Sequence, residues 1–163
     1  MNGREFLFED ARPFAECHAS SIAPAGDGGW WAVWFGGSHE RHPDVAIWGA
    51  RRGPSGGWSA PRRLARAADE AHWNPVIFRA PDGRLHLWFK TGVSVPVWKT
   101  WTQVSDDDGS TWSPARLVVP GDVGGRGPVK NKPIVLSGGA WLAGASVEVP
   151  RGEKREDWDI FLD

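Results

Sequence analysis

Glu40 and Asp44 are two carboxylates in one polar loop of this sequence, where Arg41 and two histidines also lie. Glycosidases use such a pair of carboxyl groups, one of which protonates the leaving oxygen while the other acts as base or nucleophile. Plain surface salt bridges with the neighbouring basic side chains are the alternative interpretation. The loop makes Asp44 and Glu40 candidate catalytic residues and Arg41 a candidate partner for a substrate carboxylate.

A second polar cluster, Lys130-Asn131-Lys132, carries positive charge. We expect it to begin a strand, on which residues two apart project to the same face. Burial of two like charges is costly unless an anion lies beside them. The cluster therefore indicates an anion-binding site formed by Lys130, Lys132 and the intervening Asn131.

Other candidate ligand contacts lie near the expected starts of strands or in neighbouring loops. His18 either contacts a ligand or is satisfied by the backbone, as most such histidines are. Trp73 and Trp98 have the flat apolar surface that stacks on a sugar ring, although most of the twelve Trp residues are expected to be structural anchors. Asn74 and Glu148 complete the candidate substrate-binding set.

The stretch from Ser105 to Trp112 has the composition of one tight turn that satisfies its own backbone. The carboxylate of Asp107 can accept hydrogen bonds from turn amides, and Gly109 can take positive φ without steric cost. Trp112 would then anchor the next strand. The alternative is a calcium loop, but no Glu follows at the spacing of an EF-hand. We expect a structural turn built on Ser105, Asp107, Gly109, Thr111 and Trp112, and no metal.

Composition indicates an all-β domain. The 163 residues are 40% apolar and include 12 Trp, 21 Gly and 13 Pro, which is typical of short aromatic-anchored strands separated by turns. A net charge of −1 gives no general attraction to nucleic acid or an anionic membrane. Cys17 is the only cysteine, and no signal-peptide pattern follows Met1. We expect a cytoplasmic protein as written, or a secreted or periplasmic one if a signal precedes this sequence.

A four-strand unit repeats along the chain. The first copy comprises expected strands at 17–22, 30–35, 44–51 and 58–64. The order returns at 73–78, 85–89, 99–104 and 112–117, and a third copy begins with 130–136, 141–145 and 158–162. Trp58 and Trp112, which occupy the same place in two copies, are 54 positions apart. Four strands at such a period are the signature of β-propeller blades.

The repeat divides the chain into an N-terminal arm and three units. We place the arm at 1–15, the first unit at 16–66, the second at 67–120 and an incomplete third unit at 121–163. The candidate site residues then share one end of the units, while the turn at 105–112 belongs to the opposite end. Open sheet edges at both ends of such an array favour self-association.

The turn Ser105-x-Asp107-x-Gly109-x-Thr111-Trp112 resembles the Asp-box of sialidases (neuraminidases) with BNR repeats. Trp34-Phe35-Gly36-Gly37 and 127–133 also look like bacterial proteins described as predicted neuraminidases. The resemblance implies a propeller of four-stranded blades, with roughly two and three-quarter blades in this chain and six in a parent about twice as long. It also implies a general-acid role for Asp44.

The sequence departs from the sialidase pattern at two points. His18-Ala19-Ser20 stands where the family carries the Arg-Ile-Pro of its carboxylate-gripping triad, and the chain has no Tyr to act as the nucleophile. Two hypotheses follow. One is a sialidase-like glycoside hydrolase acting on a sialic or uronic acid-like sugar without a cofactor, in which this chain alone has little activity. The other is a non-catalytic carbohydrate-binding or structural propeller piece.

Overall fold

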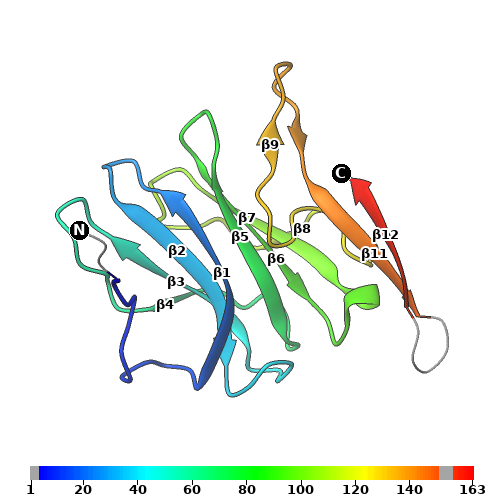
Figure 1. Ribbon diagram of the computed structural model, residues 1–163, viewed down its shortest axis with the longest axis horizontal. Helices are drawn as coiled ribbons and strands as arrows, with labels where there is room; N and C mark the ends of the chain where they lie inside the picture. Colours follow the sequence, from blue (N-terminus) through cyan, green and yellow to red (C-terminus); the bar gives the residue numbers. More distant parts are fainter. Residues whose placement is uncertain (1–3, 151–155) are drawn as a thin grey trace.

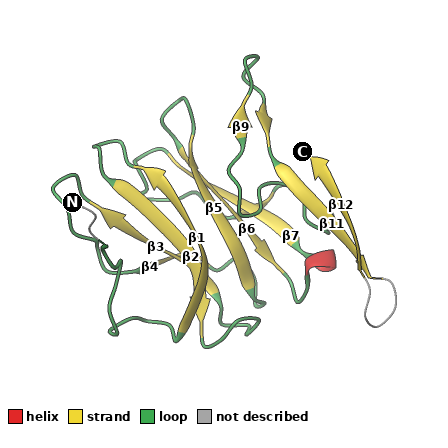
Figure 2. Cartoon of the chain, in the orientation of Figure 1, coloured by secondary structure: helices red, strands yellow, loops and turns green. Residues whose placement is uncertain are grey.

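The computed structural model describes residues 4–150 and 156–163 and confirms the all-β class. Antiparallel strands account for the regular structure of these residues apart from one short 3-10 helix, η1 (Val95–Val97) (Figure 2). The first sheet has the order β1-β2-β3-β4. Its strands are β1 (Glu16–Pro24), β2 (Trp30–Gly37), β3 (Ala46–Arg52) and β4 (Arg62–Ala65).

The second sheet repeats this order as β5-β6-β7-β8 and lies beside the first (Figure 1). Its strands are β5 (His72–Arg79), β6 (Leu85–Thr91), β7 (Lys99–Ser105) and β8 (Arg116–Leu117). Trp112 precedes β8 instead of entering it, because the Val104 amide of β7 donates to the Ser113 hydroxyl in place of a backbone carbonyl and Pro114 has no amide to donate.

The third part consists of two short hairpins. β9 (Ile134–Val135) pairs with β10 (Trp141–Leu142), and β11 (Gly144–Pro150) pairs with β12 (Glu156–Leu162). Ala143, between β10 and β11, exchanges two hydrogen bonds of 2.9 Å with Asp163, so the two hairpins adjoin. The expected strand at 130–136 is thus reduced to two residues. Within the described residues, the sheets form an open row and not a closed ring (Figure 1).

The inner strands β1 and β5 carry the same irregularity. His18 pairs with Phe35 and Ser21 with Val33, so β1 has one residue more than β2 over this span, and β5 shows the same shift between Trp73 and Val76. Ala19 lies in the first bulge with φ 55° and Asn74 in the second with φ 42°. The bulges explain why these two strands bend where they pass the candidate site.

The core lies between the first two sheets. Val33, Ile47, Ile77 and Leu87 are fully buried there, in one cluster with aromatic side chains of both sheets. The residues before β1 cover the opposite face of the first sheet, where the rings of Phe8 and Trp34 lie 5.2 Å apart. Each face of the first sheet is therefore packed, which fixes the strands that line the site.

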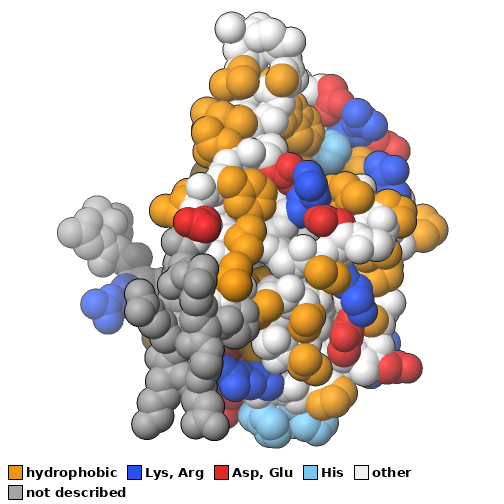
Figure 3. Space-filling model, turned by 90° about the vertical axis from the view of Figure 1, so that its right-hand side faces the viewer, with side chains coloured by type: hydrophobic (Ala, Val, Ile, Leu, Met, Phe, Trp, Pro, Cys, Tyr) orange, Lys and Arg blue, Asp and Glu red, His pale blue; other side chains and the backbone are white. Residues whose placement is uncertain are grey.

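Trp141 joins the third part to the second sheet. Its ring centroid lies 4.7 Å from His86, 5.3 Å from Phe78 and 6.0 Å from Trp88. Hydrophobic side chains gather on the face of the molecule that lies at the right of Figure 1 and is turned to the viewer in Figure 3. Ile160 of β12 is 86% exposed. In the described part of the chain, no helix is long and apolar enough to cross a membrane.

Candidate functional site

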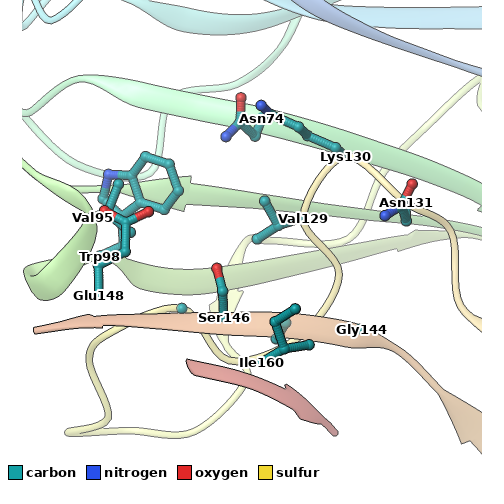
Figure 4. A pocket seen from close by; sticks show the side chains of 12 residues that line it. Asn74, Val95, Trp98, Val129, Lys130, Asn131, Gly144, Ser146, Glu148 and Ile160 are labelled. Atoms are coloured by element: carbon teal, nitrogen blue, oxygen red, sulfur yellow. The ribbon is translucent and has the colours of Figure 1, made fainter. Parts of the chain in front are cut away.

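Three adjoining cavities of about 390, 380 and 410 Å³ lie among strands β1, β5 and β11 and the loops beside them. Asn74 and Lys130 line all three, so we treat them as lobes of one funnel. Figure 4 shows the first lobe, in which the side chain of Lys130 extends toward Asn74. The three lobes include most of the predicted site residues: His18, Glu40, Arg41, Trp73, Asn74, Lys130, Asn131 and Glu148.

One wall comes from β1 and the β2–β3 loop. His18 and Glu40 line the third lobe, and Arg41 lines the second together with Glu40. The Glu16 carboxylate ties this wall together, because its Oε2 accepts a hydrogen bond of 3.2 Å from the Glu40 amide and lies 3.8 Å from His18 Nε2. A carboxyl group, an imidazole and a guanidinium thus share one rim of the funnel.

Asp44 does not line any of these lobes. The Ser38 hydroxyl and amide donate hydrogen bonds to it, its Oδ1 lies 2.8 Å from His42 Nδ1, and these partners lower its pKa to about 2. The Asp44 carboxylate is therefore occupied by partners within its own loop. These contacts hold the loop, and the general-acid role expected for Asp44 stays a prediction.

Trp73 and Trp98 support the funnel from β5 and from the residue that follows η1. Trp73 is 7% exposed, and its Nε1 donates a hydrogen bond of 2.8 Å to the Gly92 carbonyl. The two indoles pack at 5.7 Å between centroids, and Trp98 lines the first and second lobes. Their packing makes them walls of the site, with little free ring surface on Trp73.

Lys130 and Lys132 do not form the pair expected from the sequence. Residues 130–133 lie outside the strands, and Lys130 has φ 60° in a three-residue turn closed by a 2.6 Å hydrogen bond from the Asn131 amide to the Val129 carbonyl. Both lysines are exposed, but Lys130 lines every lobe and Lys132 lines none of them. The proline at 133 is buried and anchors the far end of the turn.

The opposite wall comes from the third part of the chain. Glu148 of β11 lines the first and second lobes, and Figure 4 places its side chain beside Trp98. Asn74 faces it from the β5 bulge, with 9% of its surface exposed. Carboxyl groups therefore stand on two walls of the funnel, Glu40 on one and Glu148 on the other.

The turn at 105–112 lies away from the funnel, and none of its residues lines a lobe. Asp107 Oδ1 accepts hydrogen bonds of 2.8 Å from the Ser105 hydroxyl and the Thr111 amide, and Oδ2 accepts one of 2.6 Å from the Thr111 hydroxyl. Gly109 has φ 83°, as its place in the turn predicts. Among the described residues, no group of three or more His, Cys, Asp or Glu is placed to hold a metal ion.

Lys90 is a buried polar residue of this region that the sequence interpretation missed. It is 0% exposed and lies within β6, the sixth residue of that strand. Lys90 pairs with Trp73 in the second sheet, and Phe35 pairs with His18 at the equivalent place in the first sheet. The second sheet therefore has a lysine where the first sheet has a buried phenylalanine. That replacement at a core position is the signal that could have identified it.

The comparisons with known proteins agree with the fold. Residues 28–162 match the model of the BNR repeat-like domain family. A protein of unknown function from Dyadobacter fermentans shares the fold with a TM-score of 0.66 at 8% identity, over 90% of this chain and 51% of that one. No curated protein matches the chain in sequence.

Two further solved structures carry glycosidase names. A Hadza microbial sialidase has a TM-score of 0.66 at 15% identity, over 80% of this chain and 32% of that one. An endo-arabinase from Bacteroides thetaiotaomicron has a TM-score of 0.54 at 15% identity, over 88% of this chain and 55% of that one. The chain thus spans about half the length of these structures or less, and it belongs to the BNR repeat-like domain family, with a glycosidase-like fold.

Proposed function

We propose that this chain forms part of a sialidase-like glycoside hydrolase and that its funnel binds an acidic sugar of the sialic or uronic acid type. The observation that carries the proposal is the position of Lys130, which lines all three lobes. A cation at the junction of the lobes attracts a sugar carboxylate wherever the ring lies in the funnel. Arg41 and His18 on the facing wall add further donors for the same group.

Glu40 and Glu148 are the carboxyl groups of the proposed chemistry. Both line the second lobe, and paired carboxyl groups serve glycoside hydrolysis as acid and as base or nucleophile. Asp44 is left out, because it lines none of the three lobes and its carboxylate is bound by Ser38 and His42. Asn74 would hold a sugar hydroxyl, since its amide both donates and accepts hydrogen bonds.

We also propose that the sheets are blades of a β-propeller, with units at 16–66, 67–120 and 121–163. Sheets β1–β4 and β5–β8 share one strand order, which supports equivalent units. The apolar side of the third part, with Ile160 and Leu162 exposed, has the character of a surface that another sheet covers. Site residues on further blades would complete the activity in a longer parent.

A non-catalytic carbohydrate-binding role is the second candidate. Two observations favour it: this sequence has no Tyr to act as the sialidase nucleophile, and Asp44 lines none of the three lobes. The two roles share the same anion site. They differ only in turnover.

Calorimetric titration with glucuronic acid, N-acetylneuraminic acid and glucose tests the binding site. We expect the two acids to bind, glucose to bind at least tenfold more weakly, and binding to weaken with salt. Lys130→Gln should abolish the preference for acids, whereas the matched variant Lys132→Gln should leave it intact. Equal affinity for acidic and neutral sugars would contradict the proposal. Turnover of 4-methylumbelliferyl glycosides of the same acids then separates hydrolase from binding module.

A further inference from the structure

Lys90 is the most deeply buried charged residue in the described part of the chain, with 0% of its surface exposed. Its ammonium donates hydrogen bonds to the Thr100 hydroxyl at 2.8 Å and to the carbonyl of Arg126. The carbonyl of Gly127 lies 3.5 Å away, at the limit of a hydrogen bond. Lys90 thus occupies a core position of β6 and binds backbone oxygens of the loop that precedes β9.

The same two loop residues are held from the other side. Asp163 Oδ2 accepts a hydrogen bond of 3.0 Å from the Gly127 amide, and its Oδ1 lies 2.5 Å from Arg126 Nη1. Asp122 Oδ2 also accepts from Arg126 Nε at 2.8 Å. Arg126 and Gly127 are therefore fixed by Lys90 of the second sheet and by Asp163 at the end of the third part.

Lys130 lies three residues after this fixed point, in a conformation that a lysine rarely adopts. Its φ of 60° is in the left-handed region, where a side chain with a Cβ is disfavoured. Such a conformation persists only where the surroundings determine it. The prolines at 128 and 133 are buried on the two sides of the turn, and the fixed φ of each proline limits how the backbone around Lys130 can adjust.

We infer that Lys90 is a positioning residue that sets the place of Lys130 in the funnel and thereby determines the affinity for the acidic group of the ligand. The inference rests on the proposed function of the site. Lys90 acts through the backbone and does not touch the ligand, because it lines none of the three lobes. It links the second sheet to the anion-binding turn of the third part.

The test is a double-mutant cycle on glucuronic acid affinity. Lys90→Met keeps an unbranched side chain, one heavy atom shorter, and removes the hydrogen bonds of the ammonium group to the loop. We expect it to weaken binding by about tenfold in the wild-type background and to have no effect beside Lys130→Gln, since coupled residues are not additive. A purely structural role predicts the same loss in both backgrounds, and that result would overturn the inference.

Two further variants serve as a control and as a second test of the positioning role. Lys99→Met removes a neighbouring positive charge of β7 that pairs with Glu70 at 3.1 Å, and it should leave the affinity unchanged. Asp163→Asn replaces Lys90→Met as the test if that variant does not fold. It weakens the contacts of Asp163 with Arg126 and Gly127, and it should therefore weaken glucuronic acid binding. Unchanged affinity in Asp163→Asn would then count against the inference.

Failure of the proposed function has a different signature. If the wild-type chain binds neither acid, that proposal fails, and amide hydrogen exchange of residues 126–133 still decides the positioning role. Lys90→Met, or Asp163→Asn in its place, must then raise exchange in this segment above the level in Lys99→Met. Equal exchange in the variants would reject the positioning role as well.

Discussion

Arg51 of β3 and Asp108 of the β7–β8 turn, 57 residues apart, form an ion pair of 3.0 Å between the first and second sheets. Asp108 also pairs with Arg79 of β5 and accepts a hydrogen bond of 2.8 Å from the Gly26 amide. Its carbonyl accepts a further bond of 2.9 Å from Trp31 Nε1. In the turn at 105–112, Asp107 therefore satisfies the turn's own donors, and Asp108 joins the first sheet to the second.

Replacement of Asp108 by Asn should destabilise the chain by about 1–3 kcal/mol, because the Arg79 guanidinium, whose side chain is 18% exposed, loses its charged acceptor. The Asp108 side chain is 28% exposed, so solvent screens only part of this effect. Asp106→Asn is the matched control, since Asp106 is 82% exposed and its ion pair with Arg84 is 4.0 Å long. Urea unfolding of both variants measures the difference. Equal stability would show that Asp108 does not hold the sheets together.

Asp107→Ala should lower the Tm in a pH-dependent way. The Thr111 hydroxyl and amide and the Ser105 hydroxyl lower the pKa of Asp107 to about 2, from 3.8 without them. The folded state therefore holds this carboxylate ionised, and its contribution is present above pH 3.8 and lost as the pH falls toward 2. Melting curves of wild type and variant should converge over that interval. A Tm difference that stays constant down to pH 2 would contradict the assignment.

Gly109→Ala should be more destabilising than Gly83→Ala, although both glycines have nearly the same φ, 83° and 87°. A Cβ on Gly109 would lie 2.6 Å from Trp31 Cε2, whereas a Cβ on Gly83 meets no atom within 4 Å. Gly83→Ala should therefore cost about 1–2 kcal/mol for the backbone alone. Gly109→Ala should cost about 1–3 kcal/mol more, because the Trp31 indole must move. Equal losses in urea unfolding would rule out the close contact.

The strands of the first two sheets could be expected from the sequence because local signals agree with the fold. Alternation in β6 and the Gly turns near 28 and 83 mark hairpins without reference to other parts of the chain. The third part was harder to predict. The prolines at 128 and 133 exclude a regular strand between them, and the break at Ala143 depends on hydrogen bonds to Asp163, twenty residues on.

The candidate site was predictable in its residue types but not in its geometry. The order of the strands alone predicts that His18, Asn74 and Lys130 lie at the same end of the units. The bulges do not follow from it, since an Ala at φ 55° has no local sequence signal. Neither does the position of Asp44 outside the three lobes, where the Ser38 amide and hydroxyl donate hydrogen bonds to its carboxylate.

Wild type should gain stability over Lys90→Met as the pH rises from 7 toward 10. Burial lowers the pKa of Lys90 from 10.5 to about 7, against the attraction of Asp163 and Asp122. Between these pH values the unfolded chain binds one proton more at this residue, so stability rises by about 1.4 kcal/mol per pH unit. Below pH 7 the penalty of the buried charge is fully present and the difference is constant.

The difference between wild type and variant is the quantity to measure, because Cys17 titrates over the same range. Burial raises the pKa of the Cys17 thiol, which lowers stability at alkaline pH in both proteins and cancels on subtraction. Lys99→Met is the control, and its stability relative to wild type should not rise with pH in this way. Urea unfolding at pH 6, 7, 8 and 9 gives the curve. A flat difference above pH 7 would mean that Lys90 stays charged, held so by the Arg126 carbonyl and the Thr100 hydroxyl.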